Sequence, residues 1–162
     1  MKLIVYRGGV VSFQIPADWR EEYSDTEGGM FYGDRPDSGT LRLTVITIKS
    51  PKELHPGAAK DLFEVVLRGQ QELSFKSSPR DRMDGNAVLK YQEAARERGK
   101  SLIIFYWVIA NPLPPHHARI ITFSYTILAE QQDLKSVQRD LEMLESEIEL
   151  AMFSPEIGVV PE

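Results

Sequence analysis

The run of ten residues from Ser101 to Ala110, SLIIFYWVIA, constrains the fold of this chain more than any other stretch. Because nearly every side chain in it is apolar, a strand formed here buries both of its faces. A short helix is the alternative, but the β-branched and aromatic residues and the flanking turn residues favour a strand. We therefore predict an inner strand of a sheet, with a helix covering each face.

Other segments show the alternation of apolar and polar residues that is typical of half-buried strands. The predicted strands are 10–15, 30–32, 41–48, 87–96 and 119–128, with an edge strand over 74–83 that contains Pro79. Residues 17–22, directly after Pro16, are predicted to form one helical turn. The strands follow one another through short turns, which indicates a mainly antiparallel sheet.

Two segments have the apolar spacing of helices. Residues 58–73 have it after a proline-containing loop, and residues 134–151 have it at the end of the chain, with Asp133 as the predicted N-cap. The fold class is therefore α+β. We predict an α/β/α sandwich with a central, mainly antiparallel sheet of about six or seven strands and two principal helices.

The composition of the 162-residue chain fits one domain, predicted over residues 1–153 with a loosely ordered tail over 154–162. The chain has no cysteine, which excludes disulfides and thiolate metal sites and fits a cytoplasmic protein. Its longest apolar run, 102–110, is under half of the roughly 20 residues of a membrane helix, so no membrane partner is expected.

The charge of the chain is unevenly distributed. The net charge is −5, but residues 130–162 carry nine acidic and two basic residues and contribute −7. An acidic chain of pI ≈ 5.3 is not expected to bind nucleic acid. The last helix places Glu142, Glu145 and Glu149 on one face, either as a partner surface or as a solvated face.

Two of the three histidines, His116 and His117, adjoin in the stretch NPLPPHHAR, residues 111–119. Neighbouring side chains of an extended segment point to opposite faces, so the two do not converge on one ion. We predict a bend between two strands, with no metal, no cofactor and no catalytic residue. A metal-dependent enzyme that uses this loop stays open as an alternative.

Cations gather on the predicted strands 74–83 and 87–98, which a turn at Asp84-Gly85 connects. If both strands are extended and aligned, these cations form one surface, which we call the basic ribbon and predict to bind a partner: Lys76, Arg80, Arg82, Lys90, Arg96 and Arg98. A solvated face that protects the sheet edge from aggregation is the alternative.

The sequence resembles the PsbP-like family in the stretches VSFQIPADW and MDGNAVLKY and in a final helix that runs into Met152-Phe153. The resemblance covers roughly residues 9–153. In that family Pro16, Trp19 and Gly85 match a strand stop, a buried aromatic residue and a turn. The family includes an extrinsic subunit of photosystem II, a yeast protein that binds the GTPase Ran, and bacterial chaperones for effectors of the type VI secretion system.

These observations predict a non-enzymatic module that binds an unknown protein or peptide partner, as a chaperone or adaptor. The resemblance implies such a role for bacterial members. A small apolar ligand carrier, with a pocket between helix and sheet, is a further alternative. The chain is expected to be a monomer or a homodimer.

Overall fold

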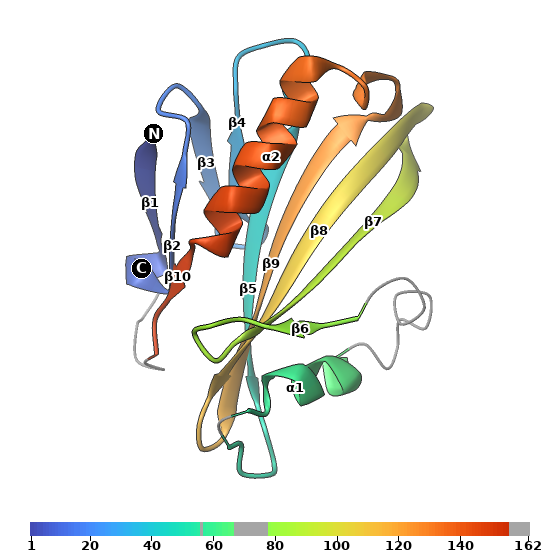
Figure 1. The fold of residues 1–162 in the computed structure, drawn as a ribbon. Helices are drawn as coiled ribbons and strands as arrows, with labels where there is room; N and C mark the ends of the chain where they lie inside the picture. The colour runs from blue at the N-terminus through green and yellow to red at the C-terminus, as the bar shows by residue number, and fades with distance from the viewer. Residues whose placement is uncertain (56, 67–77, 156–162) are drawn as a thin grey trace.

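The strands of the chain form two antiparallel sheets in the computed structural model, which describes residues 1–55, 57–66 and 78–155 (Figure 1). The larger, sheet B, has seven strands in the order β3-β4-β5-β9-β8-β7-β6. Their bounds are Arg20–Ser24 (β3), Gly28–Tyr32 (β4), Thr40–Lys49 (β5), Arg80–Asp81 (β6), Ala87–Glu97 (β7), Lys100–Leu113 (β8) and His117–Leu128 (β9). This sheet confirms the predicted α+β class and the antiparallel arrangement.

A second, three-stranded sheet, sheet A, was not predicted. It has the order β1-β2-β10, with bounds Lys2–Tyr6 (β1), Val11–Ile15 (β2) and Met152–Phe153 (β10). Short 3-10 helices lie at Arg7–Gly9 (η1) and Ala129–Gln131 (η3). Sheet A and helix α2, Lys135–Glu149, together cover one face of sheet B around a shared core that includes Phe13, Phe123 and Leu144.

Strand β8 is covered on both faces, as its sequence predicts. Trp107 and Ile109 belong to the core under α2, whereas Val108 and Ala110 belong to a second core under α1, Ala59–Val66. The two helices therefore pack on opposite faces of sheet B. Among the described residues, the core under α1 includes Val108 and Ala110 of β8, whereas the residues of β8 from 102 to 106 are half-exposed. The prediction of a helix on each face of the sheet is confirmed.

The proline-rich stretch with the paired histidines is a bend, as predicted. β8 ends at Leu113, β9 begins at His117, and these two residues are partners in the antiparallel ladder. The segment after β5 lies against the bend, because Ser50 N–H donates to the His116 carbonyl and Leu54 N–H to the Pro115 carbonyl, both at 2.6 Å. The bend thus fixes one end of the sheet.

The predicted helical turn over residues 17–22 is wrong. Trp19 N–H donates to the Pro16 carbonyl at 3.1 Å, which closes a turn, and the chain then continues as β3 paired with β4. All five side chains of β3 are exposed, so its sequence lacks the apolar alternation of a half-buried strand. Trp19 itself is buried, as predicted, and stacks on Tyr125.

Two further boundaries differ from the prediction. The edge strand expected over 74–83 is, within the described residues, only the two-residue β6, and its residues 74–77 lie outside them. Helix α2 begins at Lys135 after Leu134 and no side chain caps it, so Asp133 is not its N-cap. The second half of the predicted helix 58–73 and most of the predicted tail also lie outside the described residues.

Within the described ranges, no helix is both long enough and apolar enough to span a bilayer.

Candidate binding surface

Three cations of the basic ribbon contact helix α2 of the same chain. Arg80 Nη2 donates to Glu149 Oε2 at 2.7 Å, and Lys90 forms an ion pair with Glu145. The hydrogen bond from Arg80 holds the pKa of Glu149 below its usual value. The basic ribbon and the acidic face of the last helix, predicted separately, therefore meet in one molecule. Their charges neutralise each other where they touch.

Arg82 is bound more completely than the other two. Its side chain is only 6% exposed. Its guanidinium donates to the carbonyls of Ile148 at 3.2 Å, Glu149 at 3.1 Å and Ala151 at 3.0 Å, and it stacks over the ring of Phe153. These carbonyls lie at the C-terminal end of α2, where helix carbonyls lack partners and a cation is favourable. Arg82 thus anchors α2 to the sheet.

The remaining cations of the ribbon lie elsewhere. Arg96 lies at the far end of β7 and its guanidinium donates only to the Gly99 carbonyl, at 3.4 Å. Arg98 has a positive φ of 52°, so it belongs to the turn after β7 and not to the strand, contrary to the prediction. Lys76 lies outside the described residues. The described cations therefore divide into a group bound to α2 and an exposed group at the turn.

The outer side of β7 is a sheet edge. Although β7 has eleven residues, β6 pairs only with Val88 and Ala87. Pro79 directly precedes β6 and lies outside the ladder. Among the described residues, no strand pairs with the outer side of β7 beyond Val88.

The direction of the free backbone groups follows from one hydrogen bond. Arg82 N–H donates to the Asn86 carbonyl at 2.7 Å, so the backbone of Asn86 points toward β6. In an antiparallel ladder, alternate residues direct both N–H and C=O to the same side. The outward groups beyond β6 therefore belong to four residues, which we call the β7 edge: Lys90, Gln92, Ala94 and Arg96.

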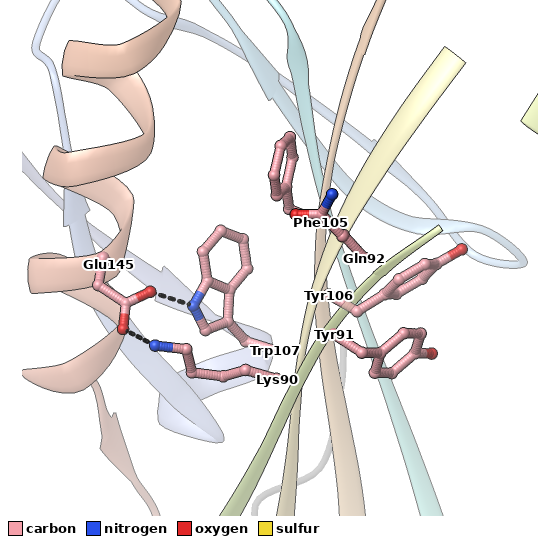
Figure 2. A pocket seen from close by; sticks show the side chains of 7 residues that line it. All are labelled: Lys90, Tyr91, Gln92, Phe105, Tyr106, Trp107 and Glu145. Carbon is pink, nitrogen blue, oxygen red and sulfur yellow. Dashed lines mark hydrogen bonds and ion pairs between the residues drawn. The ribbon is translucent and has the colours of Figure 1, made fainter. Parts of the chain in front are cut away.

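A concavity of about 340 Å³ lies where the β7 edge approaches α2. Figure 2 shows Glu145 reaching from α2 to the sheet, where one oxygen accepts a hydrogen bond from Trp107 Nε1 at 2.9 Å and the other binds Lys90. The indole and the ammonium group are both satisfied in this way. The concavity therefore has an apolar wall and a neutralised charge, and Gln92 and Phe105 line its outer part.

Two tyrosines lie on the opposite face of the same strands (Figure 2). Tyr91 and Tyr106 stack with ring centroids 4.6 Å apart, and the Tyr106 hydroxyl donates to Glu93 at 2.9 Å. Burial raises the pKa of Tyr106, and the hydrogen bond to Glu93 acts in the same direction. The aromatic pair and the cations bound to α2 thus lie on different faces, an arrangement unlike a surface that stacks bases between basic groups.

The part of this face that no described helix covers extends across four strands. Every side chain on it is half-exposed or exposed, and several are apolar or aromatic. We call it the open face: Arg42, Thr44 and Ile46 of β5, Thr122, Ser124 and Thr126 of β9, Leu102, Ile104 and Tyr106 of β8, and Tyr91, Glu93 and Ala95 of β7. Ile46 is 59% exposed. The open face adjoins the β7 edge.

The bend with the paired histidines is where the metal-dependent alternative places its site. No cluster of three or more His, Asp or Glu side chains suitable for a metal ion occurs among the described residues. His116 is exposed at the bend, and His117 begins β9. The space between α2 and sheet B, where the ligand-carrier alternative places its pocket, is filled by buried side chains that include Ile109, Phe123 and Leu144.

A buried polar cluster joins the loop before β5 to α2. Tyr125 is fully buried, and its hydroxyl donates to Asp140 Oδ2 at 3.1 Å while it accepts from Gly39 N–H at 3.1 Å. Arg35 Nη2 donates to the same Asp140 oxygen at 2.6 Å. Burial raises the pKa of Tyr125. Since each of these polar groups has a partner, we assign the cluster a structural role.

The sequence did not reveal the β7 edge or the open face. Pro79 was the available signal for the edge, because it marks where a neighbouring strand stops pairing. The open face had a weaker signal in the Thr-Ser-Thr alternation of β9, which is less apolar than a fully covered face. The extent of α1 decides how much of that face is covered.

No family model matches this sequence, and no curated protein matches it either. Solved structures are similar to it in fold. LpqN, involved in cell envelope biogenesis of Mycobacterium tuberculosis, superposes with a TM-score of 0.62 at 13% identity, over 90% of this chain and 83% of its own. A protein from Bacteroides thetaiotaomicron gives 0.61 at 15% identity over 97% of this chain, which spans 49% of that protein.

The cyanobacterial PsbP of Synechocystis sp. PCC 6803 aligns over 90% of this chain and 87% of its own at 14% identity, with a TM-score of only 0.38. At such identities the likeness shows the fold alone. The chain therefore shares its fold with LpqN and the Bacteroides protein. The resemblance to the PsbP-like family in the sequence stays a prediction.

Proposed function

We propose that the chain is a non-enzymatic binding module that takes an extended segment of a partner protein as an added strand along the β7 edge. The observation that carries the proposal is that no strand among the described residues pairs with this edge beyond Val88. Addition of a strand satisfies backbone donors and acceptors that otherwise bind only water, and many peptide-binding domains use it. The role of chaperone or adaptor suits this mode, because backbone hydrogen bonds do not depend on the side chains of the partner.

The opposite edge of sheet B is less suited to strand addition. Lys2 of sheet A reaches it, where Lys2 Nζ donates to the Trp19 carbonyl at 2.6 Å and lies 2.8 Å from Glu21 Oε2. β3 is also short, with five residues, and begins with the charged side chains of Arg20, Glu21 and Glu22. Short and charged edges discourage pairing. The β7 edge is longer and has the small residue Ala94 at its centre.

Both faces beside the β7 edge offer contacts for the side chains of an added strand. Side chains of successive residues in such a strand point alternately to the two faces. On the α2 side they meet the concavity beside Trp107 and Phe105, and on the other side they meet the open face with Tyr91 and Tyr106. This arrangement supports recognition of a partner by its backbone and its side chains together. We place the encounter in the cytoplasm, as the lack of cysteine suggests.

Replacing Ala94 by proline tests the proposal directly. The Ala94 N–H points outward, so proline removes one donor from the edge without removing a hydrogen bond between β7 and β8. In cells of the native host, a photo-crosslinking amino acid at Gln92 should capture a partner, and Ala94→Pro should abolish this capture. The readout is the crosslinked band and its mass-spectrometric assignment.

The matched control is Ala94→Ser, which keeps the N–H and should leave the capture unchanged. A second crosslinker at Gln14, exposed on sheet A, reports non-specific capture. A thermal melt of the purified Ala94→Pro protein shows whether it is folded. Capture at Gln92 that persists in a folded Ala94→Pro protein, or equals the capture at Gln14, contradicts strand addition at this edge.

A further inference from the structure

The turn between β7 and β8 carries positive charge that no ion pair between described residues neutralises. Residues 96–100, which we call the hairpin tip, contain Arg96, Arg98 and Lys100 but a single carboxylate, Glu97. None of the ion pairs between described residues includes any of the three cations. The tip therefore has a net charge of +2 in a chain whose net charge is −5.

The other end of the β7 edge has the opposite character. Lys90 is paired there with Glu145, and Arg80 beside it is paired with Glu149. Helix α2 supplies both carboxylates, whereas among the described residues no hydrogen bond or ion pair joins α2 to the hairpin tip. The cations at the start of the β7 edge are thus paired with carboxylates, whereas those at its end are not paired with any described carboxylate. The positive charge of the edge is therefore concentrated at the hairpin tip.

Between the two ends, small side chains leave apolar surface uncovered. Ala94 pairs with Ile103 and Ala95 pairs with Leu102 in the ladder between β7 and β8. Ile103 and Leu102 are both half-exposed, on opposite faces of the sheet. A methyl group does not cover an aliphatic side chain on the neighbouring strand. Large apolar side chains on an added strand, reaching across Ala94 and Ala95, would remove this surface from water.

We propose that the partner segment is an extended peptide with carboxylates at its N-terminal end, beside the hairpin tip, followed by large apolar residues opposite Ala94 and Ala95, one toward each face of the sheet. This inference rests on the proposed strand addition and specifies its chemistry. The antiparallel direction continues the pattern of sheet B and is the slightly more stable one. Because the hairpin tip is the C-terminal end of β7, an antiparallel strand begins beside it.

The physical reason for the acidic end is charge complementarity. Exposed ion pairs each contribute modestly to affinity, but several at one end also fix the direction and register of an incoming strand. Without such charges the register of an added strand is weakly specified, because the β7 residues opposite its middle are the small Ala94 and Ala95. Attraction between exposed charges is screened by salt. The preference for an acidic end should therefore weaken as the salt concentration rises.

Two synthetic peptides test the inference. Both are fluorescein-labelled and share a core of alternating valine and threonine, and they differ only in three N-terminal residues, which are glutamate in one and lysine in the other. We expect the glutamate peptide to bind the wild-type protein about tenfold more tightly by fluorescence anisotropy at low salt. The double variant Arg96→Glu/Arg98→Glu should reverse this order.

The matched control is Lys49→Glu/Lys52→Glu, which changes the net charge equally. These lysines lie at and just after the C-terminal end of β5, away from the hairpin tip, so this variant should keep the wild-type order. Equal affinity of the two peptides for the wild-type protein overturns the acidic-end inference, and so does an order that Arg96→Glu/Arg98→Glu leaves unchanged. If both peptides bind equally and Ala94→Pro abolishes both, strand addition stands and only its charge preference falls.

Discussion

Replacing Arg82 by alanine should lower the free energy of unfolding by about 2–4 kcal/mol, since a hydrogen bond to a charged group contributes about 1.5–3 kcal/mol. The change removes a buried cation from three carbonyls at the end of α2, at 3.0 to 3.2 Å, and from the ring of Phe153. The Ile148 carbonyl still accepts a hydrogen bond from Ala151 N–H, but the carbonyls of Glu149 and Ala151 lose their bonds to the guanidinium. Urea denaturation should show a lower midpoint with an unchanged slope.

The control for this variant is Arg96→Ala. Arg96 is exposed and makes one long hydrogen bond, so its truncation should change the stability by less than about 0.5 kcal/mol. The contrast separates the two groups of cations in the basic ribbon. If Arg82→Ala is as stable as Arg96→Ala, Arg82 does not anchor α2. Arg82 would then again be a candidate residue for binding a partner.

Gly28→Ala should destabilise the chain by about 2–5 kcal/mol. This is the sum of the cost of a left-handed backbone conformation for alanine and the cost of an overpacked contact. Gly28 has φ +86°, and a Cβ atom there would lie 2.1 Å from the carbonyl oxygen of Leu43. Leu43 belongs to β5 in the middle of the sheet, so neither backbone can move away easily. The measurement is again the unfolding free energy in urea.

Gly85→Ala provides the matched control. Gly85 has nearly the same φ, +84°, but nothing lies within 4 Å of a Cβ atom built there. Only the backbone cost of about 1–2 kcal/mol applies. Equal losses in the two variants would show that β4 and β5 are farther apart at Gly28 than the structure has them.

The interior of the fold could be predicted from the sequence because its signals are local. The run SLIIFYWVIA is apolar on both of its faces, so both faces must be covered. The prolines before the paired histidines mark the bend. β3 escaped prediction because an edge strand with exposed side chains has no apolar alternation to detect. The short sheet A escaped for a related reason, since β10 has only two residues.

The binding surface could be predicted only in part. The sequence places Arg80 and Lys90 on facing strands and Glu145 and Glu149 on a helix face. However, Lys90 and Glu145 are 55 positions apart, and Arg80 and Glu149 are 69 positions apart. Whether they meet depends on how α2 crosses the sheet, which no local pattern determines. Arg96 and Arg98 can be identified as the cations outside these ion pairs only when the structure shows which cations are paired.

Amide hydrogen exchange measured by NMR tests the free backbone of the β7 edge residue by residue. We expect an alternation along β7. The outward amides of Lys90, Gln92, Ala94 and Arg96 should exchange rapidly, whereas those of Tyr91, Glu93 and Ala95, which bond to β8, should be protected. Uniform protection of all seven amides would mean that the edge is already paired, and would contradict the account.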